Sequence, residues 1–352
     1  MADWTAQMKQ EFEYYTVDPG TWKDVSLITT VKSCSIDRDY TADTLGSASF
    51  DVDEQLGERY IRSYLVTIQN GVRERHPLGI HLVQTPKESF NGRVTSYSLD
   101  AYTPLIELKE NQPPLGYYCA KGANVMDTAY LIMRDHVRAP IVRATSDDIL
   151  YGDFVSNSDD TWLTFLSDLV ANANFNIALD ELGRIIFEPK QDYKSLQPRY
   201  TYTDDNSSIL YPDIELERDL YGIPNVVEVV YSDDGIYYYA SAVNDDPNSE
   251  TSTVSRGRAI TKRIENPEFA GEPTQAMVNR YAEDQLRNLS TLQYTLTYKH
   301  GYNDVKIGDC VRLNYRRANL KDIKARVTQQ SIDCSQGCPV SETAVFTERL
   351  WR

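Results

Sequence analysis

Alternating hydrophobic and polar positions dominate residues 24–108, which follow an N-terminal arm at 1–23. Asn70-Gly71 and Asn91-Gly92 separate strand-like runs, and such pairs are strong hairpin signals because type I′ turns need positive φ at both central residues. The spacing of strands and turns predicts a small antiparallel barrel or sandwich. The strand-like runs themselves are 25–36, 48–52, 61–72, 78–86 and 92–102.

The hydrophobic period changes in the next ninety residues or so. Residues 124–137 place apolar side chains at helical spacing, and a second helix follows Ser158 or Asp159, one of which is expected to be its N-cap. Residues 175–189 have the pattern of two strands joined by a turn. We therefore expect a helix–helix–hairpin insert of α+β type over residues 109–200.

The β pattern returns in residues 201–330, with one further helix expected at 274–289. Residues 223–243 predict a hairpin that turns over Asp233-Asp234-Gly235. Residues 331–352 form a C-terminal extension with a last strand. The whole pattern predicts an α+β fold that is mainly β.

The composition and charge of the chain exclude some classes of function. The chain has 352 residues and a net charge of −16, from 52 acidic against 36 basic residues. A surface this acidic repels phosphates, so sequence-specific nucleic-acid binding is not expected. The first residues lack the pattern of a signal peptide, and no apolar run is long enough for a membrane helix. Five cysteines, few and odd in number, are expected to be reduced thiols in a protein made in the cytoplasm.

The stretch YKHGYNDVKIGDCVRLNY, residues 298–315, is the strongest candidate for a site, because His300, Asp304, Asp309 and Cys310 crowd into it. These side chains are possible metal ligands. Asp309 and Cys310 are adjacent in a strand pattern, however, and would point to opposite faces. The Asn-Asp and Gly-Asp pairs are also typical of turns, so a reverse turn entering a strand is favoured. Alternate apolar positions support that strand: Val311, Leu313 and Tyr315.

Cys334 and Cys338 form a second candidate, as a thiol pair spaced by three residues. A structural zinc site usually needs a second pair at matched spacing, which the chain lacks. The two thiols could close a small disulfide loop in oxidising surroundings, but unpaired thiols near a loop are the default.

The sequence contains no recognisable catalytic motif. The four histidines, His76, His81, His136 and His300, lie in no nucleophile or zinc motif, and no phosphate-binding glycine loop is present. The sequence therefore assigns no catalytic, cofactor-binding or metal-binding residue.

Tyrosine clusters at 237–239 and 117–118 allow two interpretations. They could stack on sugars in a carbohydrate-binding module. Alternatively, successive tyrosines of a strand face the core and a subunit interface in turn, which we favour.

Several stretches resemble the baseplate or tail-tip hub proteins of tailed bacteriophages, the family that includes the late control protein of contractile tails. The resemblance covers most of residues 24–316. It is carried by DVSLITTVKSCSIDRDYTADTLGSASFDV (24–52), WLTFLSDLVANANFNIALDELGRIIFEP (162–189), NVVEVVYSDDG (225–235), SRGRAI (255–260), the helix at 274–289 and HGYNDVKIGDCVRLNY (300–315).

This resemblance implies two tube-protein-like antiparallel β-barrels, at 24–108 and 201–330, joined by the α+β insert. It implies a non-enzymatic homotrimer whose six barrels form a pseudo-sixfold ring. Such a ring joins the hexameric tail tube, or a distal tail protein, to a trimeric central spike or fibre. DNA and the tape-measure protein would pass through its acidic channel. The chain would be assembled in the host cytoplasm and end in the virion. A carbohydrate-binding receptor module and a peptidoglycan-degrading enzyme using Asp304 and Asp309 remain as alternatives.

Overall fold

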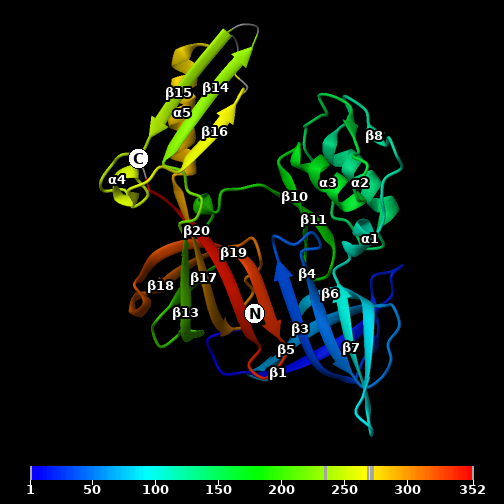
Figure 1. Cartoon of the computed structure of the whole chain (residues 1–352). Helices are drawn as coiled ribbons and strands as arrows, with labels where there is room; N and C mark the ends of the chain where they lie inside the picture. The colour runs from blue at the N-terminus through cyan, green and yellow to red at the C-terminus, as the bar shows by residue number, and fades with distance from the viewer. Residues whose placement is uncertain (1, 234–235, 268, 270–272, 351–352) are drawn as a thin grey trace. The chain divides into compact units, whose positions relative to one another are not determined.

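The computed structural model describes residues 2–233, 236–267, 269 and 273–350. The fold is α+β and mainly β, as the sequence predicts (Figure 1). The chain divides into two compact units. Unit 1 comprises Met1–Ile214 and Tyr298–Ala344, and unit 2 comprises Glu215–Thr297 and Val345–Arg352.

The N-terminal half-sheet of unit 1 consists of seven antiparallel strands in the order β3-β4-β7-β6-β5-β1-β2. The segment 1–23, expected as an arm, contains β1, which pairs with β5 from Lys9↔Ile68 to Val17↔Tyr60. The strands are β1 (Lys9–Val17), β2 (Asp24–Leu27), β3 (Val31–Asp39), β4 (Gly46–Val52), β5 (Tyr60–Gln69), β6 (Val72–Phe90) and β7 (Thr95–Tyr102).

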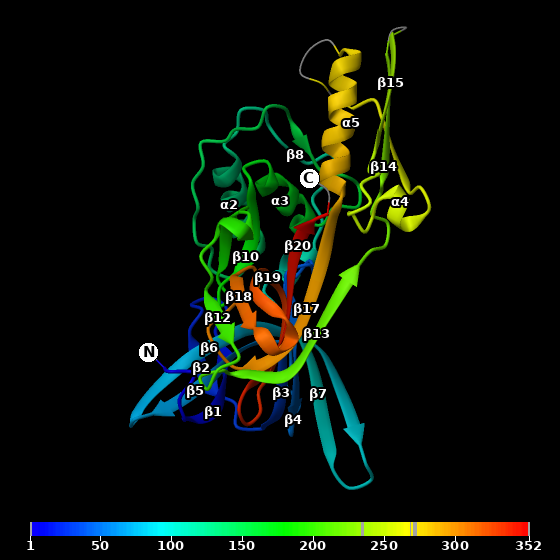
Figure 2. The same ribbon diagram turned by 90° about the vertical axis from the view of Figure 1, so that its left-hand side faces the viewer.

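Both predicted hairpins are present, but only one has the two-residue turn. At Asn70-Gly71 the φ angles are 51° and 80°, and Gln69 pairs with Val72. At the second site pairing stops at Phe90↔Thr95. There the Asn91 side chain accepts a hydrogen bond from the Val94 amide (2.9 Å), which closes a longer loop. The distal part of this β6–β7 hairpin extends beyond the other strands of the half-sheet (Figure 2).

The C-terminal half-sheet continues the same 13-stranded sheet, because β19 pairs with β3 from Gln329↔Asp39 to Asp333↔Ser35. Strand β12 joins β18 in parallel, and three strands, β13, β17 and β20, run from unit 1 into unit 2. The predicted segment 201–330 is thus divided between the units. The elements are β12 (Tyr200–Thr203), β13 (Leu210–Asp219), β17 (Thr291–Gly301), β18 (Cys310–Tyr315), η2 (Arg316–Ala318), β19 (Leu320–Asp333) and β20 (Pro339–Arg349).

Direct pairing of β3 with β19 satisfies backbone groups that would otherwise be free at the edges of the two half-sheets. The apolar core follows the pairing: Ile36 and Phe50 from the N-terminal half-sheet share one buried cluster with Ile332 and Val340 from the C-terminal half-sheet. The two halves of the sheet are therefore joined by hydrogen bonds and by a common core.

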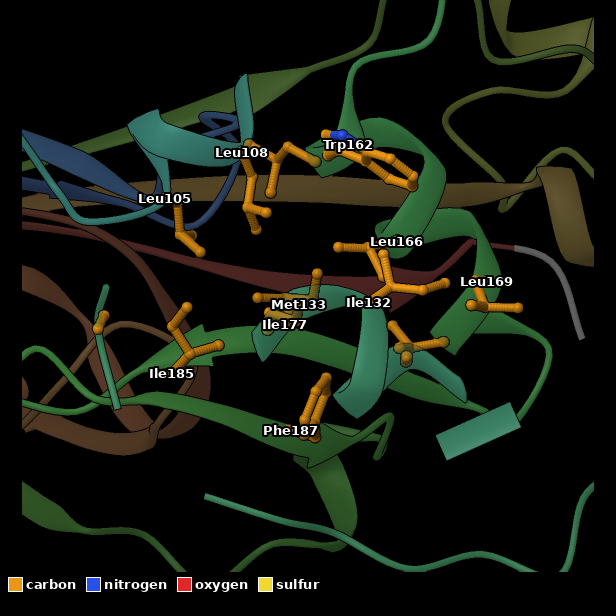
Figure 3. Packing of buried hydrophobic residues seen from close by; sticks show 14 of the residues in the cluster. Leu105, Leu108, Ile132, Met133, Trp162, Leu166, Leu169, Ile177, Ile185 and Phe187 are labelled. Carbon is orange, nitrogen blue, oxygen red and sulfur yellow. The ribbon is translucent and has the colours of Figure 1, made fainter. Parts of the chain in front are cut away.

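The insert has the predicted order of helix, helix and hairpin. Apolar faces of α2 and α3 pack with the hairpin around one cluster, in which Ile132, Leu166 and Ile177 lie together (Figure 3). The elements of this part are α1 (Ile106–Lys109), β8 (Tyr118–Cys119), α2 (Val125–His136), β9 (Phe154–Val155), α3 (Trp162–Ala171), β10 (Phe175–Leu179), β11 (Ile185–Pro189) and η1 (Tyr193–Ser195).

The predicted N-cap of α3 is wrong. Thr161 caps the helix in place of Ser158 or Asp159, and its hydroxyl accepts from the Thr164 amide (3.2 Å). The Thr164 hydroxyl in turn accepts from the Thr161 amide (2.8 Å), which completes a reciprocal cap.

Unit 2 contains a three-stranded sheet in the order β15-β14-β16 with α5 packed on it. The predicted hairpin is confirmed by β14–β15 pairing from Val226↔Val243 to Asp233↔Ile236; its turn residues Asp234 and Gly235 lie outside the described residues. The predicted helix is also confirmed. The elements are β14 (Val226–Asp233), β15 (Ile236–Val243), α4 (Thr253–Arg256), β16 (Thr261–Glu265) and α5 (Gln275–Leu289).

Candidate functional site

Residues 306–309 form the predicted reverse turn. The Asp309 amide donates to the Lys306 carbonyl (3.2 Å), and the Asp309 carboxylate accepts from the Lys306 amide (2.9 Å). Gly308 supplies the positive φ of 89°. Burial raises the pKa of Asp309, while the hydrogen bond and charge of Lys306 oppose that rise. Strand β18 then buries the three predicted positions: Val311, Leu313 and Tyr315.

The four candidate residues of the stretch 298–315 do not converge on one point. Asp304 forms an ion pair with Arg199, and both side chains are about half exposed. Cys310 is buried in β18. His300 is fully buried and has other partners. Among the residues described, no group of three or more His, Cys, Asp or Glu side chains has the arrangement of a metal site.

His300 belongs to a buried polar network centred on Glu342, whose exposed fraction is zero. The His300 Nδ1 donates to the Gly301 carbonyl (2.7 Å), since a carbonyl only accepts. Its Nε2 lies 3.1 Å from the Tyr202 hydroxyl and 3.4 Å from the Glu342 carboxylate. Tyr298 donates its hydroxyl to the same carboxylate. A buried carboxylate requires several donors of this kind to offset its loss of hydration.

Gln330 extends the network to the N-terminal half-sheet. Its side-chain amide donates to Glu342 (2.7 Å) and to the Val305 carbonyl (2.9 Å), and its carbonyl accepts from Arg38 (3.1 Å). Strands β3, β12, β17, β19 and β20 all contribute to this network, which will be called the Glu342 network. Because each donor has a fixed place, the network favours one register of these strands.

Burial and the nearby Glu342 carboxylate hold the pKa values of Tyr202 and Tyr298 well above the ordinary range. Both phenols therefore remain neutral donors at physiological pH. The sequence drew attention to His300 alone in this network. Glu342, Tyr202 and Tyr298 lie in ordinary strand patterns, and no local signal distinguishes them.

A second buried histidine lines a cavity of about 90 Å³ in unit 1, between β3, β6 and the β10–β11 hairpin. Burial and the charge of Arg38 lower the pKa of His81 to about 3, so its ring is neutral. Its Nδ1 has no hydrogen-bond partner within the described part of the chain. Gly183, at φ 69°, allows the hairpin to approach, because a Cβ there would lie 2.8 Å from the Ile80 Cβ.

The other two histidines pack against aromatic rings. His76 contacts the edge of Trp4 and lies 3.0 Å from the Thr67 hydroxyl. His136 is in the last turn of α2 and stacks on Trp162 with ring centroids 4.2 Å apart. Both arrangements are explained by packing.

All five cysteines are free thiols. Cys338 is buried in a turn at φ 42°, and its amide donates to the Ser335 carbonyl (2.9 Å). Cys334 has a different close neighbour, Cys34 on β3, whose carbonyl accepts from the Cys334 amide (3.0 Å).

The predicted alternation of the tyrosines on β15 is confirmed. Tyr238 packs against the α5 cluster, whereas Tyr237 and Tyr239 are 64% and 44% exposed. On that open face Tyr239 donates its hydroxyl to Glu228 (3.2 Å). In the insert, Tyr117 packs edge-on against Trp162 and Tyr118 is exposed.

Within the described residues, no helix is both long and apolar enough to cross a membrane. No protein-family model matches the chain, and no curated protein matches its sequence. Solved structures do match its fold. The tail protein from Neisseria meningitidis MC58 has a TM-score of 0.64 and 15% identity, covering 96% of each chain.

The 43 kDa tail protein of prophage MuSo2 from Shewanella oneidensis has a TM-score of 0.61 and 9% identity, over 95% of this chain and 98% of that chain. A chain of the Francisella PdpA–VgrG complex has a TM-score of 0.56 and 10% identity, over 98% of this chain and 53% of that one. The chain therefore has the fold of phage tail proteins, a fold that also occurs in that complex.

Proposed function

We propose that the chain is a structural component of a phage tail or a related injection machine. The observation that carries this proposal is the likeness of fold to two tail proteins over nearly the whole length of both chains. A likeness of that extent involves both half-sheets, the insert and unit 2 together, and so supports a shared architectural role.

More specifically, the chain would be the hub at the tail tip or baseplate. The N-terminal half-sheet, which includes β1, and the C-terminal half-sheet, which includes β20, would provide the two tube-like barrels of each subunit, with the insert between them. Three copies would then present six barrels to the hexameric tail tube or a distal tail protein. The opposite side, with threefold symmetry, would hold a central spike or fibre.

The net charge of −16 supports a lumen through which DNA and the tape-measure protein pass without adhering. The role would be non-enzymatic. Asp304 pairs with Arg199 and Asp309 closes its own turn, so the two carboxylates considered for hydrolysis have structural partners.

Co-expression of the chain with the tail-tube protein of the same phage tests the hub role. We expect light scattering to give three times the mass of the chain, and electron microscopy to show a ring capping the tube. A chain that remains monomeric and unattached in the presence of the tube protein would overturn the proposal.

Carbohydrate binding is the second candidate, because Tyr237 and Tyr239 are exposed on the same face of β15. Saccharide titration of the wild type and of Tyr237→Ala and Tyr239→Ala variants tests it. Tyr221, which is 92% exposed, provides the matched Tyr221→Ala control. Saturable binding lost in both variants and kept in the control would support this function; no binding by the wild type would end it.

A further inference from the structure

Two cysteines about 300 residues apart in the sequence are direct cross-strand neighbours in unit 1. The β3–β19 pairing ends at Asp333↔Ser35, and the next residues along are Cys334 and Cys34. The Cys334 amide donates to the Cys34 carbonyl (3.0 Å), so the pairing extends to the cysteines. Opposite residues of an antiparallel pair carry their side chains on the same face, at Cα separations that disulfides commonly span.

The two thiols differ in their exposure to solvent. Cys34 is 4% exposed, whereas Cys334 is partly exposed at the end of its strand. Burial and the adjoining Cys334 thiol raise the pKa of Cys34. Tyr14 lies beside both thiols, and together they raise the pKa of its phenol beyond the effect of burial. One thiol is thus accessible to a reagent, and the other lies next to it in the core.

We propose that Cys34 and Cys334 form a disulfide site that covalently joins the two half-sheets when the protein meets a small disulfide oxidant such as oxidised glutathione. The Cys334 thiolate attacks one sulfur of the oxidant, forms a mixed disulfide and releases the first glutathione thiolate. The Cys34 thiolate then attacks the Cys334 sulfur and releases the second. Two protein thiols are oxidised, one glutathione disulfide is reduced, and the two protons go to the two released thiolates.

The sequence left open a different pair, Cys334 with Cys338, and the structure argues against it. Cys338 is fully buried, and its amide is used within the turn that begins at Ser335. Cys34 lies directly opposite Cys334 in the strand pairing, whereas Cys338 follows four residues later, after the turn. The strand pairing therefore favours the thiol on β3 as the partner of Cys334.

The bond would lie beside the pairing of β3 with β19, through which the two half-sheets join. A cross-link there closes a loop of about 300 residues and restricts the unfolded chain strongly, since loop-closure entropy increases with loop length. A particle that passes from a reducing cytoplasm to an oxidising exterior would gain resistance to opening at this pairing.

Incubation of the full chain with oxidised glutathione, followed by alkylation and peptide mass spectrometry, tests the site. We expect the wild type to fall from five alkylatable thiols to three and to yield a peptide linking Cys34 to Cys334. Dithiothreitol should reverse both changes. The oxidised form should also melt at a higher temperature than the reduced form.

Single variants identify the partners. Cys338→Ser and the distant Cys119→Ser should each still lose two thiols, whereas Cys34→Ser and Cys334→Ser should give no linked peptide. A peptide linking Cys334 to Cys338, retention of all five thiols, or glutathione remaining attached to Cys334 would each overturn the proposal. These outcomes are read from the wild type, so the proposal remains testable if the Cys34→Ser variant fails to fold.

Discussion

Glu342 accepts hydrogen bonds deep in the core of unit 1, and replacing it with glutamine removes its charge at almost constant volume. In the variant, an amide nitrogen replaces one carboxylate oxygen. The Gln330 amide, 2.7 Å from that carboxylate, and the Tyr298 hydroxyl both donate to Glu342, on different oxygens. The new side chain must therefore keep its carbonyl toward Gln330 and place its nitrogen toward Tyr298, whose hydroxyl then accepts and loses the acceptor for its own hydrogen. Gln330 cannot simply flip, because its carbonyl already accepts from Arg38 (3.1 Å).

The expected loss combines one hydrogen bond to a charged acceptor with one buried donor left unpaired. Together these cost about 3 kcal/mol in the free energy of unfolding, or on the order of a hundredfold in the folding equilibrium. Chemical denaturation followed by circular dichroism measures the difference. Glu348→Gln is the matched control on the same strand, where the side chain is exposed; we expect about 0.5 kcal/mol or less there.

A double-mutant cycle gives the sharper test. Tyr298→Phe alone removes a donor from the carboxylate and should cost about 2 kcal/mol. In the Glu342→Gln background it should cost clearly less, because the charged acceptor is already gone. Equal costs in the two backgrounds, or a Glu342→Gln variant as stable as the Glu348→Gln control, would show that the Glu342 network does not stabilise the fold.

Three further predictions concern other parts of unit 1. Gly183→Ala should destabilise the fold by about 1–3 kcal/mol more than Gly116→Ala, as measured by thermal denaturation. Both glycines have positive φ, but only at Gly183 would the added Cβ meet a neighbouring side chain. Equal losses of stability in the two variants would contradict this prediction. Thr161→Ala should lower the free energy of unfolding by about 1 kcal/mol through loss of the N-cap of α3, while Ser158→Ala should change it little. A larger loss for Ser158→Ala than for Thr161→Ala would instead support Ser158, the N-cap predicted from sequence. Burial lowers the pKa of His81 to about 3 from an ordinary 6.5, so below pH 6.5 the unfolded chain binds a proton that the folded chain does not. Stability from this residue is complete above pH 6.5 and falls by about 2 kcal/mol at pH 5. Denaturation at pH 7 and pH 5 should show that His81→Gln loses less stability on acidification than the wild type, and parallel losses would contradict the assignment.

Local elements of this fold could be predicted because their signals are short-range. The turn at Asn70-Gly71 needs only two residues that tolerate positive φ, and the helix at Val125–His136 needs only apolar side chains at helical spacing. The hairpin of the insert and the turn that enters β18 follow from the same kind of signal. The N-cap of α3 was misplaced because several adjacent polar residues can each act as a cap, and side-chain geometry decides among them.

The spatial partners of the candidate site residues could not be predicted from the sequence. His300 was grouped with Asp304 and Asp309 because they are close in the chain, but its acidic neighbour in the core is Glu342, 42 positions away. Cys334 was grouped with Cys338, but the residue opposite it in the strand pairing is Cys34.

Local sequence patterns were sufficient to predict the type of most elements, the mainly β class and the turn chemistry of residues 306–309. The tertiary structure alone decided that β3 pairs with β19, and with that pairing which polar groups and thiols meet. Strand pairing depends on which free edges come together and which side chains share a buried face. Local propensity contains neither piece of information, because both arise only when distant segments pack.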